Sequence, residues 1–120
     1  MAIDLGSELR RFANTCRWSL DGWRAAWATE KSLRQWTIAN GLSAALALTL
    51  DLTPTERALI LALGLLVLAA ELMNTAIEET VDYISKAQDP RAGRAKDCGS
   101  AAVALTAIAA GVAWAVILIG

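Results

Sequence analysis

The chain has 120 residues, of which 56% are apolar and 19% charged, and its 11 basic and 12 acidic side chains give a formal net charge of −1. This length fits one domain, the apolar content excludes a disordered chain, and the charge balance excludes the broad basic surface that binds nucleic acid. The sequence has no His, which excludes His-based catalysis and His-ligated metal sites. Its two Cys, at positions 16 and 98, are too few for a disulfide framework. The mean hydropathy of +0.43 indicates a membrane protein.

The first predicted element is an amphipathic helix over residues 5–28. Its apolar side chains recur at intervals of three and four residues, namely Leu5, Leu9, Phe12, Cys16, Leu20, Trp23 and Trp27. At about 100° per residue these positions fall within an arc of roughly 80°, and Arg10, Arg17 and Arg24 lie on the other side. Because Trp prefers the level of the lipid headgroups, the pattern predicts a helix lying on the membrane surface.

Three apolar stretches predict membrane-spanning helices, over residues 33–50, 55–84 and 97–119. Charged residues are absent from positions 35–50, 58–70 and 98–120. The last of these runs has 23 residues, which at about 1.5 Å per residue crosses a hydrocarbon core of roughly 30 Å. Before the second stretch, Thr53, Pro54 and Glu56 have the spacing of a helix start with a capping box.

The basic residues predict how these helices are oriented. Six of the eleven Lys and Arg lie in residues 1–34 and four in residues 86–96, whereas residues 51–57 hold only Arg57. The positive-inside rule therefore places the N-terminus in the cytoplasm and the C-terminus on the other side of the membrane. The third stretch is rich in Gly, Ala and Ser, which lets helices approach closely and favours association within or between chains.

The second stretch carries polar residues that a membrane helix rarely keeps. Helical geometry puts five of them within an arc of roughly 100°, and we call this set the polar stripe: Glu71, Asn74, Thr75, Glu78 and Asp82. A charge in mid-span costs about 2.5–3.5 kcal/mol, which favours a functional Glu71 such as a general base. The alternative is a protonated Glu71 that only forms a hydrogen bond to a neighbouring helix. Glu78 and Asp82 lie nearer the water and suit a hard cation such as Mg²⁺.

A second polar cluster occupies residues 91–97, just before the third stretch. Its basic residues fit simple anchoring at the cytoplasmic surface. Lys96 beside Asp97 at a predicted helix start is more specific, because an ammonium there can hold a phosphate while the carboxylate orients it. Neither a P-loop nor a dinucleotide-binding Gly-rich motif occurs in the sequence, so a conventional nucleotide fold is excluded.

Motifs in these regions resemble a known family. Residues 71–78, Glu-Leu-Met-Asn-Thr-Ala-Ile-Glu, followed by Asp82, look like the signature of the prokaryotic diacylglycerol kinase family. Residues 94–103, Arg-Ala-Lys-Asp-Cys-Gly-Ser-Ala-Ala-Val, resemble its second block. Trp18-Ser19, Gly22–Trp27, Glu30 and Arg34-Gln35 resemble the N-terminal block of its proteobacterial branch. The resemblance covers the whole chain as one domain. It implies an all-α homotrimer in the bacterial inner membrane, with the C-terminus in the periplasm, that phosphorylates a lipid hydroxyl with MgATP.

The resemblance also implies roles for individual residues. Glu71 is expected to take the proton from the hydroxyl of diacylglycerol, and Glu30 and Glu78 to hold Mg²⁺ that bridges the ATP phosphates. The expected ATP-binding residues are Arg11, Trp18, Glu30, Asn74, Glu78, Lys96 and Asp97. The expected lipid-binding residues are Arg11, Ser19, Trp23, Arg34, Glu71 and Ser100. Neighbouring subunits are expected to share each site.

Two other activities are alternatives. The Gram-positive branch of the family phosphorylates undecaprenol, although residues 99–103 and the Trp-rich N-terminal block favour diacylglycerol. A small proton-coupled transporter also places a Glu in a short helical bundle, but such a protein usually has four spans and a single intramembrane acid. A non-catalytic scaffold accounts for the small-residue helix and leaves the polar stripe unexplained.

Overall fold

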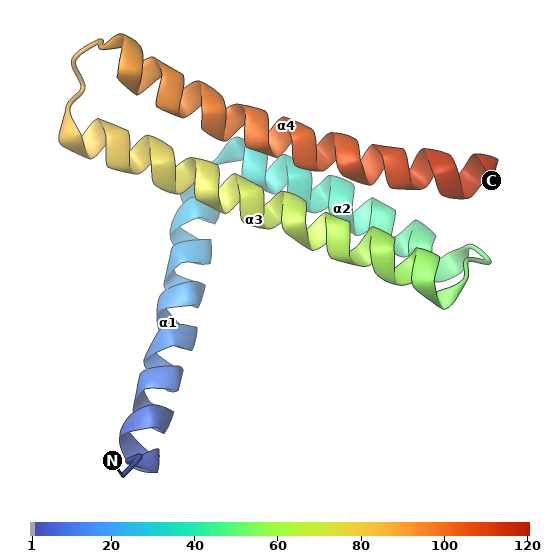
Figure 1. Cartoon of the computed structure of the whole chain (residues 1–120), viewed down its shortest axis with the longest axis horizontal. Coiled ribbons are helices and arrows are strands. Elements are labelled where there is room, and N and C mark those ends of the chain that lie inside the picture. The colour runs from blue at the N-terminus through green and yellow to red at the C-terminus, as the bar shows by residue number, and fades with distance from the viewer. Residues whose placement is uncertain (1) are drawn as a thin grey trace.

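The computed structural model describes residues 2–120, and this part of the chain is entirely helical outside its short connections. Four helices follow one another, α1 (Leu5–Thr29), α2 (Lys31–Thr49), α3 (Pro54–Ile84) and α4 (Pro90–Ile119). Figure 1 shows α2, α3 and α4 running alongside one another while α1 leaves them at a steep angle. The predicted surface helix and the three predicted apolar helices are therefore all present as helices.

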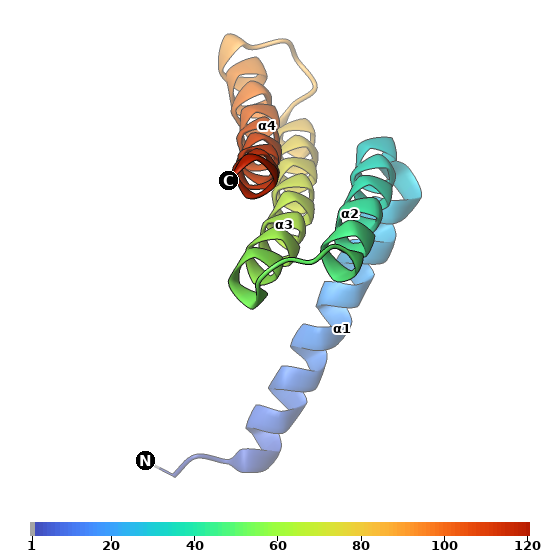
Figure 2. The same cartoon turned by 90° about the vertical axis from the view of Figure 1, so that its right-hand side faces the viewer.

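The first helix begins and ends close to its predicted limits. Asp4 is the N-cap, and its side chain accepts a hydrogen bond from the backbone N–H of Gly6 over 3.1 Å. Figures 1 and 2 show that the N-terminal part of α1 lies away from the other helices. Leu5, Leu9 and Phe12 are accordingly more than 60% exposed, so the apolar face of α1 is free to contact lipid.

A sharp corner at Glu30 joins α1 to α2. Glu30 has extended backbone angles, φ −102° and ψ 104°, and is both the C-cap of α1 and the N-cap of α2. Arg34 Nη1 donates hydrogen bonds to the carbonyl oxygens of Trp27, over 2.7 Å, and Ala28, over 3.5 Å. Leu33 is fully buried beside it. The corner is thus fixed by one buried side chain and by a guanidinium that caps the last turn of α1.

The start of α3 confirms the predicted capping box. Thr53 Oγ1 accepts a hydrogen bond from the backbone N–H of Glu56, and the Glu56 carboxylate accepts one from the backbone N–H of Thr53. Arg57, in the first turns of α3, donates to the carbonyl oxygens of Ala47, Leu50 and Leu52 over 2.8, 3.4 and 3.2 Å. Arg57 therefore caps the C-terminus of α2 and fastens the α2–α3 connection.

Replacing Arg57 by Ala is expected to lower the free energy of unfolding by about 2 kcal/mol, because the last carbonyl groups of α2 lose a charged donor. Thermal unfolding of the detergent-solubilised protein, followed by circular dichroism, measures this effect. Arg10→Ala removes an exposed Arg from the polar face of α1 and is the matched control. An equal melting temperature for the two variants contradicts the capping role of Arg57.

The last helix begins at Pro90 and not at residue 97, which corrects the predicted start. Asp89 is the N-cap, its carboxylate accepts from the backbone N–H of Arg91 over 2.8 Å, and Pro90 occupies the first helical position. Lys96 consequently lies in the second turn of α4, so the expectation that it stands at a helix start is wrong. The Arg91 side chain and backbone N–H hold the pKa of Asp89 below its ordinary value. The stabilisation from this cap is therefore present above the unfolded-state pKa and is lost as pH falls through the folded-state pKa.

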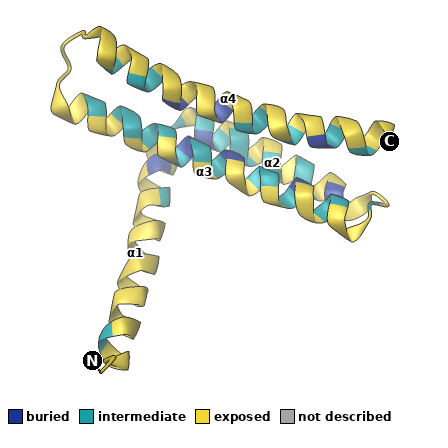
Figure 3. Cartoon of the chain, viewed as in Figure 1, coloured by how far each residue is buried: buried dark blue, intermediate teal, exposed yellow. Residues whose placement is uncertain are grey.

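Packing is centred on α3, which lies between α2 and α4 and contacts both. Ala47, Ile60 and Ala113 form a small core at the far end from α1, and the indole N–H of Trp114 donates to Ser43 Oγ over 2.8 Å, linking α4 to α2. Figure 3 shows that most of the described residues are exposed. Large apolar side chains such as Leu65, Leu105 and Ile108 are 59–69% exposed. So much exposed apolar surface fits a lipid environment rather than water.

Within residues 2–120, two helices are long and apolar enough to span a membrane, α3 and α4. These two match the second and third predicted spans. The predicted first span, now α2, has 19 helical residues, and its crossing of the membrane stays a prediction.

Candidate active site

Glu71 is the buried charged residue of the described chain, with only 4% of its surface exposed. It lies on α3 where the α1–α2 corner packs against that helix. The hydroxyl of Ser32, in the first turn of α2, donates a hydrogen bond to Glu71 Oε2 over 3.1 Å. Thr75 Oγ1 donates to the backbone carbonyl of Glu71 one turn earlier. The carboxylate is thus enclosed by helices and held by one hydroxyl group.

Asn74 and Glu78 form the middle of the polar stripe. Asn74 Nδ2 donates to Glu78 Oε1 over 3.4 Å. Asn74 Oδ1 is buried and has no hydrogen-bond partner among the described residues. This oxygen lies against Gly99 of α4, where a Cβ atom would collide with it. Gly99 therefore allows α4 to approach the stripe closely, and the Asn74 oxygen is enclosed against it.

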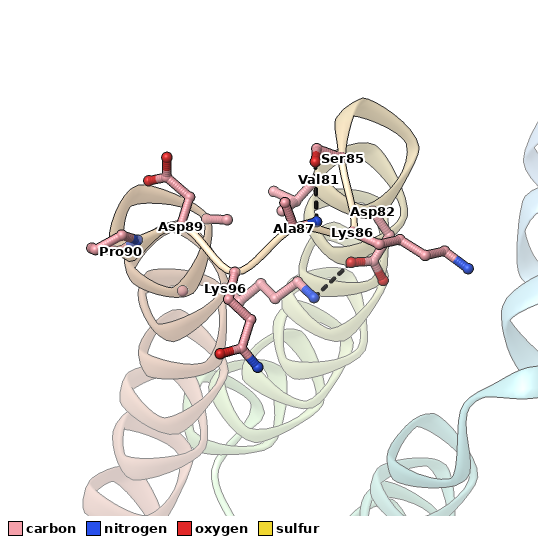
Figure 4. Close-up of a pocket in the computed structure, with 11 residues that line it drawn as sticks. Val81, Asp82, Ser85, Lys86, Ala87, Asp89, Pro90 and Lys96 are labelled. Atoms are coloured by element: carbon pink, nitrogen blue, oxygen red, sulfur yellow. Dashed lines mark hydrogen bonds and ion pairs between the residues drawn. The ribbon is translucent and has the colours of Figure 1, made fainter.

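The end of the stripe faces a polar pocket at the α3–α4 connection. Lys96 Nζ of α4 and Asp82 Oδ1 of α3 form an ion pair of 2.7 Å, with 38% and 47% of the side chains exposed. Figure 4 shows this pair pointing toward each other at the pocket, together with Ser85, Lys86 and Asp89. The pocket has a volume of about 580 Å³. Its mixture of ammonium and carboxylate groups suits a polar, charged ligand.

A second groove lies between α1 and α3. It has a volume of about 600 Å³, and most of its lining is apolar, with Ala25, Ala26 and Leu72 among the residues. Ser19 and Trp23, both expected to bind lipid, line this groove. Trp23 also stacks on Trp27, with ring centroids 5.9 Å apart. An apolar groove beside an exposed amphipathic helix suits an acyl chain.

Four other expected site residues line neither the polar pocket nor the apolar groove. Arg11 and Trp18 are exposed on α1, and Asp97 and Ser100 are exposed on α4. No hydrogen bond joins these four side chains to the polar stripe within residues 2–120. Their expected roles stay predictions.

Glu30 and Arg34 occupy the α1–α2 corner. Glu30 is half-buried and its carboxylate accepts a long hydrogen bond, of 3.5 Å, from Thr29. Arg34 is engaged with the last carbonyls of α1, and its expected lipid contact stays a prediction. Across the described residues, no group of three or more acidic or Cys side chains gathers as a ready-made metal site.

Ser32 is the site residue that the sequence did not reveal. A Ser near a helix start is ordinary in sequence terms, and its partner is 39 residues away. The one available signal was that a buried Glu71 needs a donor from another helix. That reasoning does not select Ser32 from the other hydroxyl groups of the chain.

The fold and the site together define a small helical membrane protein with a buried carboxylate, a polar pocket and an apolar groove on one helix. Residues 17–118 match the family model described as prokaryotic diacylglycerol kinase. The chain belongs to this family, and it is thus an enzyme of an ATP-dependent lipid kinase family.

Three relatives illustrate the similarity, each named diacylglycerol kinase. The protein from Pseudomonas aeruginosa is 46% identical over 114 residues, covering 93% of this chain and 91% of the relative. The protein from Escherichia coli K12 is 38% identical over 108 residues, covering 90% and 88%. The protein from Haemophilus influenzae is 34% identical over 110 residues, covering 92% and 93%. The similarity therefore extends over nearly the whole length of each protein.

Proposed function

We propose that the chain transfers the γ-phosphoryl group of MgATP to the hydroxyl of diacylglycerol, giving phosphatidic acid. The observation that carries this proposal is the position of Glu71, a buried carboxylate on a helix able to span a membrane. The same helix, α3, lines both the apolar groove and the polar pocket. A lipid hydroxyl and a nucleotide phosphate can thus approach one helix from two sides.

Glu71 acts as the general base in this proposal. The lipid hydroxyl gives its proton to the carboxylate as its oxygen attacks the γ-phosphorus, and ADP leaves with the electron pair of the broken bond. Phosphoryl transfer needs positioning and charge neutralisation more than covalent help from the protein. A base held below the headgroups meets a hydroxyl that stays in the membrane, which removes the need to extract the lipid.

The carboxylates of Glu30 and Glu78 would hold Mg²⁺ together with ATP phosphate oxygens. The Glu78 carboxylate fits this ion, because its oxygen atoms are the hard ligands that Mg²⁺ prefers, and Asn74 Nδ2 donates a hydrogen bond to one of them. Two protein carboxylates suffice, since Mg²⁺ commonly keeps phosphate and water ligands. When bound, the ion neutralises charge on the transferred phosphoryl group. Asn74, whose Nδ2 donates to Glu78 Oε1, would help to position the nucleotide beside that carboxylate.

The polar pocket is proposed to take the nucleotide. Lys96 would exchange Asp82 for a phosphate oxygen, and Asp97 would orient the phosphate chain. Lys96 reaches the pocket from the second turn of α4, so its ammonium, and not the helix terminus, supports phosphate binding. Arg11 and Trp18 complete the proposed ATP contacts.

The apolar groove is proposed to take the lipid, and the amphipathic α1 forms one of its walls. Proposed lipid contacts are Arg11, Ser19, Trp23, Arg34 and Ser100. Arg11, Trp18, Asp97 and Ser100 are exposed and line neither the polar pocket nor the apolar groove of one chain, which supports a homotrimer whose neighbouring subunits complete each site. In this arrangement α2, α3 and α4 cross the inner membrane, with the N-terminus in the cytoplasm and the C-terminus in the periplasm.

The first experiment follows ³²P from γ-labelled ATP into lipid, with purified protein in mixed micelles containing Mg²⁺. Diacylglycerol and undecaprenol are offered separately, and a reaction without lipid is the blank. We expect label in phosphatidic acid that requires both Mg²⁺ and diacylglycerol. Label only in undecaprenyl phosphate assigns the alternative substrate, and label in neither product contradicts the proposed kinase reaction.

A further inference from the structure

We infer that Ser32 is a positioning residue for Glu71, holding the carboxylate in the orientation from which it takes the proton of the lipid hydroxyl. The inference rests on the proposed function, because it needs Glu71 to be the base. Its observation is the 3.1 Å hydrogen bond from Ser32 Oγ to Glu71 Oε2, between α2 and α3.

The donor is fixed in place by the corner that carries it. Ser32 is half-buried in the first turn of α2, and the next residue, Leu33, is fully buried. Arg34 then holds the last turn of α1 through the carbonyl oxygen of Trp27. Because the residues that follow Ser32 are anchored, its backbone is held where the hydroxyl can reach Glu71.

The carboxylate has little else to orient it. Glu71 is 4% exposed, so few water molecules reach it. Among residues 2–120, Ser32 is the one side chain that donates a hydrogen bond to its carboxylate. The other nearby hydroxyl, of Thr75, is used on the backbone carbonyl of Glu71. A carboxylate with a single donor takes its orientation from that donor.

The hydrogen bond from Ser32 also gives the two carboxylate oxygens of Glu71 different roles. Oε2 accepts from Ser32, whereas Oε1 accepts no hydrogen bond from the described residues. Oε1 is therefore the atom left to accept the proton of the lipid hydroxyl. Ser32 keeps its own proton throughout, so it acts through Glu71 and makes no bond to the phosphoryl group.

The test compares Ser32→Ala with Ser32→Thr, which keeps the hydroxyl group. Ser32→Ala is expected to lower kcat for diacylglycerol about tenfold with unchanged KM for ATP and for lipid, since one hydrogen bond to a charged group is lost. The kcat of Ser32→Thr for diacylglycerol is expected to stay within about twofold of that of the unmodified protein. Thr49→Ala is the matched control, because the Thr49 hydroxyl bonds only to backbone carbonyls at the other end of α2.

A second measurement separates a positioning role from a general structural one. In Glu71→Asp, the shorter side chain withdraws from Ser32, so adding Ser32→Ala is expected to cost less than about twofold in kcat. A further tenfold loss in this background means that Ser32 acts independently of Glu71 and overturns the inference.

The outcomes distinguish this inference from the proposed function. An unmodified protein that phosphorylates no diacylglycerol contradicts the proposed function itself. An active protein whose kcat is unchanged in Ser32→Ala overturns only the role of Ser32. A raised KM for lipid at unchanged kcat also overturns it, because that result makes Ser32 a binding contact.

Discussion

Replacing Glu71 by Gln is expected to reduce phosphoryl transfer to diacylglycerol at least about a hundredfold while MgATP binding is largely retained. Gln has nearly the same size as Glu, and its carbonyl oxygen can still accept the Ser32 hydroxyl, but it cannot accept the substrate proton. The side chains proposed to hold the nucleotide make no hydrogen bond to the Glu71 carboxylate among the described residues, so we expect them to keep their positions. Labelled-phosphate transfer and calorimetric titration with MgATP measure the two quantities separately.

The two readouts also show how this assignment fails. Near-normal turnover in Glu71→Gln means that another group takes the proton, and Glu71 then has only a structural hydrogen bond. If both MgATP binding and turnover are lost, Glu71 acts in the nucleotide site or in folding. A melting temperature equal to that of the unmodified protein excludes a folding defect.

Replacing Glu78 by Gln is expected to weaken MgATP binding at least about tenfold and to raise the Mg²⁺ concentration needed for half-maximal turnover. The substitution removes one of the two carboxylates proposed to hold the ion, and it keeps an oxygen that can accept from Asn74 Nδ2. Steady-state turnover measured against Mg²⁺ at fixed ATP gives the shift directly.

The matched control for this charge change is Glu8→Gln, in the first turn of α1. It also removes one negative charge, at an exposed position outside the proposed site. We expect its Mg²⁺ dependence to equal that of the unmodified protein. An unchanged Mg²⁺ dependence in Glu78→Gln contradicts the role of this carboxylate as a metal ligand.

Much of the fold could be predicted because residues close together in the sequence indicate where each helix lies and where it begins. The alternation of apolar and basic residues indicated α1, and Thr53, Pro54 and Glu56 marked the start of α3. The start of α4 was missed because residues 90–96 carry three basic side chains, and the prediction followed the uncharged segment rather than the cap. Asp89 and Pro90 carried the necessary signal, since an acidic N-cap before Pro is a common helix start.

The polar stripe was predictable for a similar reason, since helical geometry alone puts its members on one face of α3. Ser32 and Gly99 were not, because each acts on the stripe from another helix. Their roles depend on which helices pack together and at what register, and no local sequence pattern fixes that. The ion pair between Lys96 and Asp82 across the α3–α4 connection was also not predicted from the sequence.

The α1–α2 corner connects α1 to the proposed base, Glu71, through hydrogen bonds. Arg34 is bonded to the last turn of α1, and Ser32, two residues earlier, is bonded to Glu71. A change in the tilt of α1 therefore displaces the same short segment that orients the carboxylate. With α1 at the headgroup level, as predicted, lateral pressure would act on it directly, and the packing of the bilayer would be one of the quantities that set the geometry of the proposed proton transfer.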